Sequence, residues 1–190
     1  MKKILFSWLM VSLLFQGCAP VTNFHGITAN VPQGAHYQKF IVHSNLADAE
    51  NRKTIEDAVV QQLVAIGVSA TASYSVFPPE AVYTWPEKKQ MIQAGRFDAG
   101  LLVQVVDSYN KTQTQFFINH TAADFTTAHV KMQTKILDTR SFTVVWQAKS
   151  TSLAQTDDEG GVSLEDVMAS YATALVTELQ NDGVVVGTTN

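Results

Sequence analysis

The stretch from Tyr37 to Tyr74 constrains the fold most, because its hydrophobic pattern changes from strand to helix and back to strand. Residues 37–43 form a short apolar run that is rich in strand formers. Apolar residues then recur at helical spacing over residues 49–66, and Gly67 follows where a helix C-terminus favours glycine. Residues 68–74 alternate as a second strand. Two strands joined by a helix in this way are expected to be parallel, with a right-handed connection.

The middle of the chain continues the alternation of helix and strand. A short helix is predicted to begin at Pro86, since proline suits a first helical turn, and to end at Gly95. The continuous apolar run 101–106 predicts a central strand that is covered on both faces. Residues 112–118 are polar and β-prone, and residues 123–128 form a weak stretch. The order up to the central strand is β, α, β, α, β.

The remainder of the chain predicts a β-meander followed by a helix. Residues 130–136 alternate apolar and polar side chains, and residues 142–148 are the expected antiparallel hairpin partner. Residues 164–179 carry a nearly ideal amphipathic stripe behind a capping box at Ser163, and residues 184–186 could add a short final strand. We therefore predict an α/β (α+β) domain with a mixed parallel and antiparallel sheet. Its order is βαβαβ, then a β-meander, then a C-terminal α-helix, with the helices packed on the sheet in two or three layers.

The chain begins with two lysines and an apolar-dominated run over residues 4–15. That run has the length of the hydrophobic region of a secretory signal, and it is well short of the roughly 20 residues that a membrane-spanning helix needs. Cys18 is the only cysteine and directly follows the small residue Gly17. An export signal implies an oxidising compartment, but a lone cysteine has nothing to pair with in this chain. Cys18 is therefore best explained as an attachment point.

These residues resemble the lipobox of bacterial lipoproteins, in which diacylglycerol is attached to the cysteine thiol and the peptide bond before it is then cut. Gly17 fits that pattern, whereas the two residues before it depart from it. The resemblance implies a lipoprotein signal peptide over residues 1–17 and a Cys18 that carries lipid, palmitate included, as a membrane anchor. Because Ala19 follows where inner-membrane lipoproteins carry Asp, it also implies the outer membrane, with the domain facing the periplasm. The alternative is an ordinary secreted protein whose signal ends near a cysteine.

The remaining sequence divides into a tether, one domain and a tail. Removal of the first 17 of the 190 residues leaves 173, which is enough for one domain with a sizeable core. Residues 18–36 comprise the lipid-bearing cysteine and a spacer without regular period, the alternative being a short edge strand that involves Ile27 and Val31. Residues 37–186 are expected to form a single periplasmic α/β domain, and residues 187–190 a disordered tail.

The charge of the chain argues against two classes of partner. Without Lys2 and Lys3, 11 Lys and Arg stand against 17 Asp and Glu, so the mature net charge is −6. Nucleic acids and anionic membrane surfaces are bound by clustered Lys and Arg, which this sequence lacks. We therefore expect no nucleic-acid partner and membrane contact through the N-terminal lipid alone.

No motif predicts a catalytic, metal or cofactor site. His120, Asp124 and His129 are closest to a metal-ligand set, but they lie in loop and edge-strand sequence without a fixed ligand spacing. Residues 157–161 are more typical of a solvated acidic turn than of a calcium loop. His43 ends the first predicted strand and does not by itself imply catalysis. Nucleophile elbows and phosphate-binding glycine loops are absent from the sequence, so we expect no enzyme activity, no cofactor and no metal.

Four aromatic residues around a proline pair are the least ordinary feature of the chain. Tyr74, Phe77, Tyr83 and Trp85 are more aromatic than a passive connector needs. Exposed aromatic side chains are typical of interface hot spots, because they bury large areas at low entropic cost. These four are therefore candidate partner-contact residues, and packing of the loop onto the sheet is the alternative. Trp146, in contrast, is predicted to lie in the core.

Several short pieces match the residue pattern and element order of known periplasmic domains. They resemble the small α/β domains of the amino-terminal part of the Tol-system periplasmic protein, of the curli-secretion lipoprotein and of outer-membrane lipoproteins of unknown function. The resemblance spans most of residues 38–183 and carries no catalytic residues. The matching pieces are Ile55–Val59, Gly67–Tyr74, Phe77–Pro79, Asp98–Asp107 and Asp138–Trp146.

These observations together favour a non-catalytic accessory domain of the cell envelope that is lipid-anchored and recognises another envelope protein. One competing hypothesis is a small-molecule or glycan-binding domain with a pocket beside the C-terminal end of the 101–106 strand, where open α/β sheets tend to bind ligands. Another, which follows only from the curli-type resemblance, is a subunit of a secretion assembly.

Overall fold

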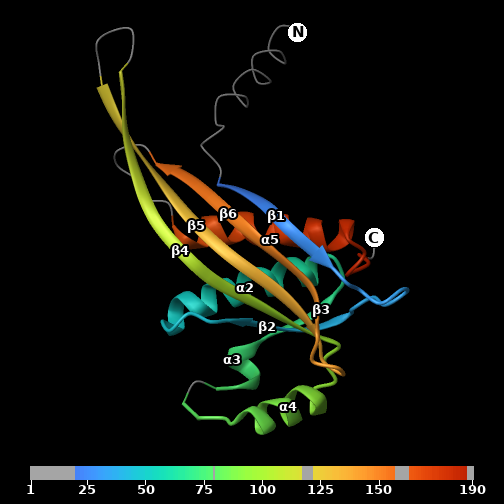
Figure 1. Cartoon of the computed structure of the whole chain (residues 1–190). Helices are drawn as coiled ribbons and strands as arrows, with labels where there is room; N and C mark the ends of the chain where they lie inside the picture. The colour runs from blue at the N-terminus through green and yellow to red at the C-terminus, as the bar shows by residue number, and fades with distance from the viewer. Residues whose placement is uncertain (1–19, 79, 117–121, 157–162, 188–190) are drawn as a thin grey trace, which may run out of the picture.

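The computed structural model describes residues 20–78, 80–116, 122–156 and 163–187, with the side chains of 113–116, 122–125 and 155–156 outside the description. Within these residues the chain forms one sheet with helices packed on it, as predicted (Figure 1). The elements are β1 Val21–Ala29, β2 Lys39–Ser44, α2 Ala49–Ala65, β3 Ser69–Ala72, α3 Ser73–Val76, α4 Trp85–Ala94, β4 Ala99–Phe116, β5 Ala122–Asp138, β6 Val144–Thr156 and α5 Leu164–Asn181.

The sheet is mixed, and its strand order is β1-β6-β5-β4-β2-β3. β2 pairs in parallel with β3 on one side and with β4 on the other. β4, β5 and β6 follow one another as an antiparallel meander, and β1 pairs antiparallel with β6. The parallel pair around the first helix and the later meander are therefore both confirmed.

Helix α2 begins and ends where its sequence directs. The Asp48 carboxylate accepts a hydrogen bond from the Asn51 N–H at 2.8 Å, which satisfies one of the free donors of the first turn. At the other end Gly67 has a φ of 83°, a conformation that costs other residues about 1–2 kcal/mol. Its N–H bonds Val64 O at 2.9 Å, and the Val68 N–H bonds Leu63 O at 3.0 Å, which is the hydrogen-bond pattern of a Schellman motif.

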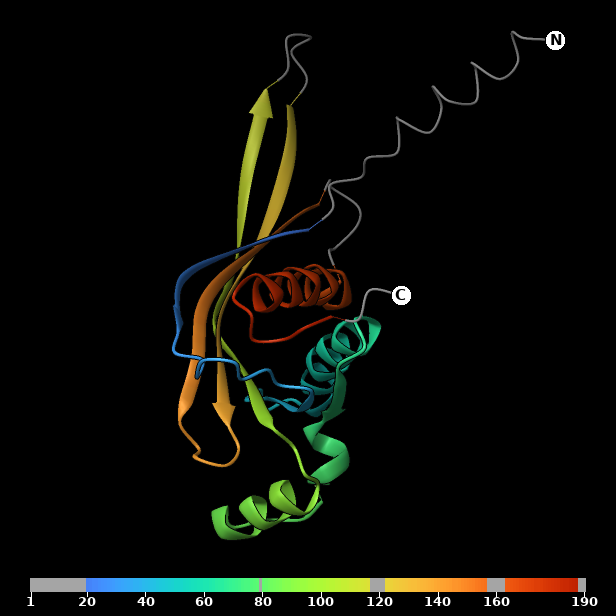
Figure 2. The ribbon, with the colours of Figure 1, turned by 90° about the vertical axis from the view of Figure 1, so that its right-hand side faces the viewer.

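Helices α2 and α5 cover the same face of the sheet, as Figure 2 shows from the side. The main core lies between these helices and the strands, and its largest fully buried side chain is Trp146 of β6. The indole N–H of Trp146 donates to the Asp182 carboxylate at 2.7 Å, just past the end of α5. Its predicted core position is confirmed. No helix of the described residues is long and apolar enough to cross a membrane.

The prediction that the 101–106 strand is covered on both faces is wrong. Leu101 and Val103 of β4 are buried, whereas Val106 is 62% exposed. Side chains alternate between the faces of a strand, so only one face of β4 meets α2 and α5. The opposite face is covered at one end only, where α4 lies (Figure 2).

The expectation of an irregular spacer before residue 37 is also wrong for residues 21–29, which form the edge strand β1. The alternative of an edge strand is the one observed, with Ile27 in it and Val31 packed at the edge of the core. The ring of Phe24 lies 5.8 Å from that of Tyr171 and 6.5 Å from that of Trp146. Phe24 is the one large apolar side chain of β1 that packs on the core. Polar residues and Gly26 surround it, so the sequence shows no clear strand pattern here.

Strands β4 and β5 are longer than predicted and form one continuous hairpin. Residues 112–118 were expected to be polar and β-prone and residues 123–128 to be a weak stretch, but β4 runs to Phe116, which pairs with Ala122 of β5. In Figures 1 and 2 this hairpin extends beyond the helices. Residues without a helix to cover them need no apolar face, which explains why alternation gave no signal there. Val184 and Val185 are buried but form no strand.

Candidate functional site

A pocket of about 290 Å³ lies on the face of the sheet opposite α2 and α5. Phe40 and Val42 of β2 point into the main core, so Ile41 and His43 between them point to the pocket side. Helix α4 and the β5–β6 turn form the remaining walls. The residues that line the pocket are Ile41, His43, Phe77, Trp85, Lys88, Ile92, Gly100, Leu102, Leu137, Thr139 and Phe142.

A small second core supports this pocket. Ile41, Ile92 and Phe97 are buried together, and Val76, Phe77 and Phe142 pack against them. Helix α4 begins with a capping arrangement in which the Glu87 carboxylate accepts from the Thr84 N–H and hydroxyl, both at 2.7 Å. These hydrogen bonds hold the pKa of Glu87 below its usual value. The helix is thus fixed at its start, next to Trp85.

The rim of the pocket is aromatic and basic. Trp85 is 59% exposed, and its ring meets the Phe142 ring edge-on at 5.6 Å. The Lys88 ammonium lies 5.8 Å from the centre of the Phe77 ring, and the Lys89 ammonium lies 4.8 Å from that of Phe142. Ammonium groups at such distances are attracted to the faces of aromatic rings. The mouth therefore combines exposed apolar surface with two positive charges.

The structure gathers three of the four predicted aromatic residues and separates the fourth. Phe77 and Trp85 line the pocket, and the Tyr83 ring lies 6.0 Å from that of Phe77. Tyr74 instead contacts α2, because its hydroxyl donates a hydrogen bond to Asp57 of that helix. This bond and burial raise the pKa of Tyr74. The strand predicted over residues 68–74 ends at Ala72, and Ser73 and Tyr74 instead belong to the short helix α3.

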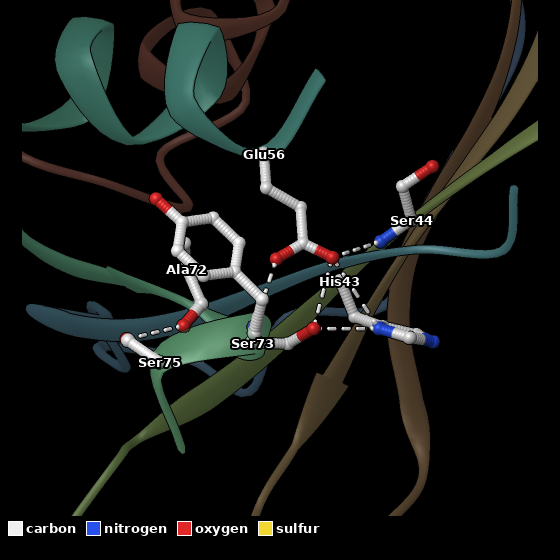
Figure 3. A network of polar contacts seen from close by, with 7 residues as sticks. His43, Ser44, Glu56, Ala72, Ser73 and Ser75 are labelled. Carbon is white, nitrogen blue, oxygen red and sulfur yellow. Dashed lines mark hydrogen bonds and ion pairs between the residues drawn. The ribbon is translucent and has the colours of Figure 1, made fainter. Parts of the chain in front are cut away.

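A buried carboxylate, that of Glu56, lies next to His43, which lines the pocket (Figure 3). Glu56 of α2 is 0% exposed and accepts hydrogen bonds from the Ser44 N–H at 3.0 Å, the Ser73 hydroxyl at 2.9 Å and the Tyr74 N–H at 3.2 Å. Burial by itself raises the pKa of Glu56, but its hydrogen bonds, with the His43 contact among them, outweigh burial and hold the pKa below its usual value. The side chain is therefore an anion that ties α2 to β2 and α3.

The protons of this network can be assigned from the hydrogen bonds. The Ser73 hydroxyl has one proton, which it donates to Glu56, so its oxygen can only accept from His43 Nδ1 at 2.7 Å. Nδ1 is also 3.5 Å from the Glu56 carboxylate, and the other ring nitrogen points away from both partners (Figure 3). A catalytic triad needs the two imidazole nitrogens on different partners. Here one nitrogen meets both partners, and Ser73 is buried, so the arrangement positions His43 and does not activate Ser73 as a nucleophile.

The other sequence candidates do not converge on a site within the described residues. Cys18, His120 and the acidic turn 157–161 lie outside them, as does the side chain of Asp124. His129 stacks on Tyr109 with ring centres 4.6 Å apart. In residues 20–78, 80–116, 122–156 and 163–187, no three His, Cys, Asp or Glu are grouped to hold a metal ion.

The pocket lies at the opposite end of the central strand from the predicted one. Gly100 and Leu102, which line it, are at the start of β4, and the expected place was beside Val106. The rule for open α/β sheets places ligands outside the carboxyl ends of parallel strands. In this sheet the carboxyl end of β4 continues into the long hairpin with β5. Helix α4 directly precedes β4 in the chain and lies against the start of that strand, so the pocket forms there.

Comparisons with known proteins give distant structural likenesses and no family. No family model matches the chain, and no curated protein matches it. Similar solved structures include the PelC dodecamer from Paraburkholderia phytofirmans, with 14% identity, a TM-score of 0.48, and coverage of 87% of this chain and 99% of that one. Lipoprotein GNA1162 from Neisseria meningitidis has 16% identity and a TM-score of 0.42, with 75% and 98% covered. A minor lipoprotein from Acinetobacter baumannii has 10% identity and a TM-score of 0.39, with 76% and 92% covered. Likenesses this distant do not assign the chain to a family.

Proposed function

We propose that this protein is a lipid-anchored, non-catalytic accessory domain of the cell envelope that binds another envelope protein through the pocket beneath α4. The proposal rests on one observation, an apolar pocket with Trp85 exposed at its rim. Three of the four predicted contact aromatics, Phe77, Tyr83 and Trp85, lie at this pocket. Trp and Tyr are enriched among the few residues that contribute most of the binding energy of protein interfaces.

The position of the pocket in the fold supports an anchored binding domain. Val21 of β1 pairs with Leu153 of β6, and Leu153 pairs with His129 of β5, so the start of β1 lies level with His129. The pocket lies further along β5, where Leu137 lines it. Leu137 lies eight positions beyond His129 along β5, a distance of about 26 Å at 3.3 Å per residue. Cys18 precedes Val21 by three residues. A lipid on Cys18 would thus hold one end of the sheet at the membrane and leave the pocket at the far end.

The composition of the pocket favours a protein partner over a glycan. Its lining is mostly aliphatic and aromatic, and its polar side-chain groups among the described residues are those of His43, Lys88 and Thr139 and the indole N–H of Trp85. The Thr139 hydroxyl already donates to the carbonyl of Phe97. Sugar recognition requires many convergent hydrogen-bonding groups, because each buried sugar hydroxyl needs a partner.

Copurification of the full-length lipoprotein after crosslinking in cells tests this proposal. Trp85→Ala is expected to remove the captured envelope protein, since loss of an aromatic hot-spot residue costs about 2 kcal/mol or more, a factor of about 30 in affinity. Tyr109→Ala is the matched control, because Tyr109 is an exposed aromatic on β4 outside the pocket lining. Equal capture by wild type and Trp85→Ala would contradict the proposal.

The membrane part of the proposal has its own test in the same cells. Cys18→Ala removes the thiol to which the lipid would be attached, so this variant should not be processed as a lipoprotein and should leave the outer-membrane fraction. A variant that is processed and fractionates like wild type would overturn the anchor while leaving the pocket untouched.

A further inference from the structure

The two lysines at the pocket mouth, Lys88 and Lys89, differ from the lysines of the domain that form ion pairs. Lys53 forms an ion pair with Asp57, and Lys131 forms one with Asp107. Among the described residues, Lys88 and Lys89 have no such carboxylate partner and lie instead over Phe77 and Phe142. A chain with a net charge of −4 thus places two unpaired positive charges beside its apolar pocket.

Two carboxylates that neighbour pocket-lining residues in the chain, those of Glu87 and Asp138, accept hydrogen bonds from their own turns. Glu87 is held by the N–H and the hydroxyl of Thr84, at the start of its own helix. Asp138 accepts from the N–H groups of Arg140 and Ser141 at 2.9 and 2.8 Å. No acidic residue lines the pocket within the described part of the chain. Because Lys88 and Lys89 form no ion pair among the described residues, their positive charges remain available to an incoming anion.

The size of the pocket limits what can fill it. Drug-sized ligands occupy pockets of roughly 300–1,000 Å³, and this pocket of about 290 Å³ lies at the lower limit. One bulky apolar side chain of a partner fits such a volume, with the neighbouring residues of its chain held outside at the mouth. Residues on either side of that anchor would then lie next to Lys88 and Lys89.

We infer that the partner segment recognised by this pocket is acidic, with one bulky apolar residue flanked by Asp or Glu. The apolar residue fills the space between Ile41, Leu102 and Phe142. The flanking carboxylates face the two ammonium groups, and the charge match selects acidic over basic segments. This inference rests on the proposed function, because it defines the partner of the same pocket.

Selection from a random dodecapeptide phage library on the full-length protein in detergent tests the inference. Peptides retained by wild type, and not by Trp85→Ala, are expected to carry an aromatic or large aliphatic residue with Asp or Glu within two positions. Synthetic peptides from that set should bind at least 10-fold tighter than versions with Lys in place of the acids. Their affinity should also fall as the salt concentration rises.

A charge reversal provides the matched variant. Lys88→Glu combined with Lys89→Glu keeps good helix formers in α4 and should weaken the acidic peptides at least 10-fold while improving binding of the Lys versions. Enrichment of peptides without acidic residues, or no enrichment at all, would overturn the inference. So would displacement of the acidic peptide by sodium dodecanoate at equal or lower concentration, which would identify a lipid-like ligand.

The two proposals fail in different ways. If Trp85→Ala loses the partner in cells and the double lysine variant keeps it, the proposed function stands and the acidic partner segment is wrong. If neither variant changes the capture, the pocket is not the partner site and both proposals fall.

Discussion

Glu56 is the residue on which the wall between the core and the pocket depends. Its carboxylate accepts three hydrogen bonds from β2 and from the start of α3 while fully buried. Glu56→Gln keeps the shape but places an N–H₂ group against at least one of these donors. We expect the free energy of unfolding to fall by about 1–3 kcal/mol, the cost of an unsatisfied buried group, when urea unfolding is measured at pH 7.

The same residue predicts a pH dependence of stability. The pKa of Glu56 is lower in the folded protein than the value of about 4.3 for a free glutamate, despite its burial. Ionised Glu56 therefore stabilises the fold above that pH, and this stabilisation is lost as the pH falls through the folded pKa. The difference between wild type and Glu56→Gln should shrink between pH 5 and pH 3. A difference that is as large at pH 3 as at pH 7 would refute this account.

His43 shows what the sequence could not provide at residue scale. Its position at the end of a strand was visible, but its partners Glu56 and Ser73 lie 13 and 30 residues further along. Neither residue has a motif around it, because the network depends on three elements meeting. A glutamate on the inward stripe of an amphipathic helix was the available signal. The prediction of a helix over residues 49–66 rested on its apolar residues and did not single out Glu56.

At the scale of elements, β1 carries the sharpest prediction. Phe24 packs on Tyr171 and Trp146, so Phe24→Ala should lower the free energy of unfolding by about 1–3 kcal/mol, less than the 3–5 kcal/mol of a fully buried phenylalanine. Val21→Ala is the control, since Val21 is 55% exposed on the same strand. Equal stability of Phe24→Ala and wild type in urea unfolding would mean that residues 21–29 are a tether after all.

The elements that the sequence predicted well are those with a strong period and a clear stop. Residues 49–66 and 164–179 matched α2 and α5 closely, because each has an apolar stripe, a capping residue and a defined end. The hairpin partner expected at residues 142–148 is observed as β6, which begins at Val144 and continues to Thr156. The short α3, the edge strand β1 and the polar ends of β4 and β5 have no such period. Their structure depends on what lies beside them, which a sequence pattern does not reveal.

At the scale of the whole molecule, the sheet separates the two ends at which the protein is proposed to act. The chain enters the sheet at Val21, which pairs with β6 near the carboxyl end of that strand. The pocket with Trp85 lies at the opposite end of β6, beside the turn that joins β5 to β6. The sequence identified most of the aromatic residues of this pocket but placed the hollow at the wrong end of β4. That error arose because a general rule for parallel sheets was applied to a strand whose far end belongs to an antiparallel hairpin.

Site-specific photocrosslinking in living cells tests the central claim, that the pocket end is the partner-binding end, most directly. Val82 is 99% exposed beside Tyr83, so a photoreactive amino acid there leaves Trp85 and the pocket intact. The same amino acid at Tyr109 probes an exposed aromatic position toward the other end of β4. We predict a discrete adduct with an envelope protein from position 82, absent from position 109 and lost when Trp85→Ala is added. The same adduct from both positions, or an adduct from position 109 alone, would contradict the account.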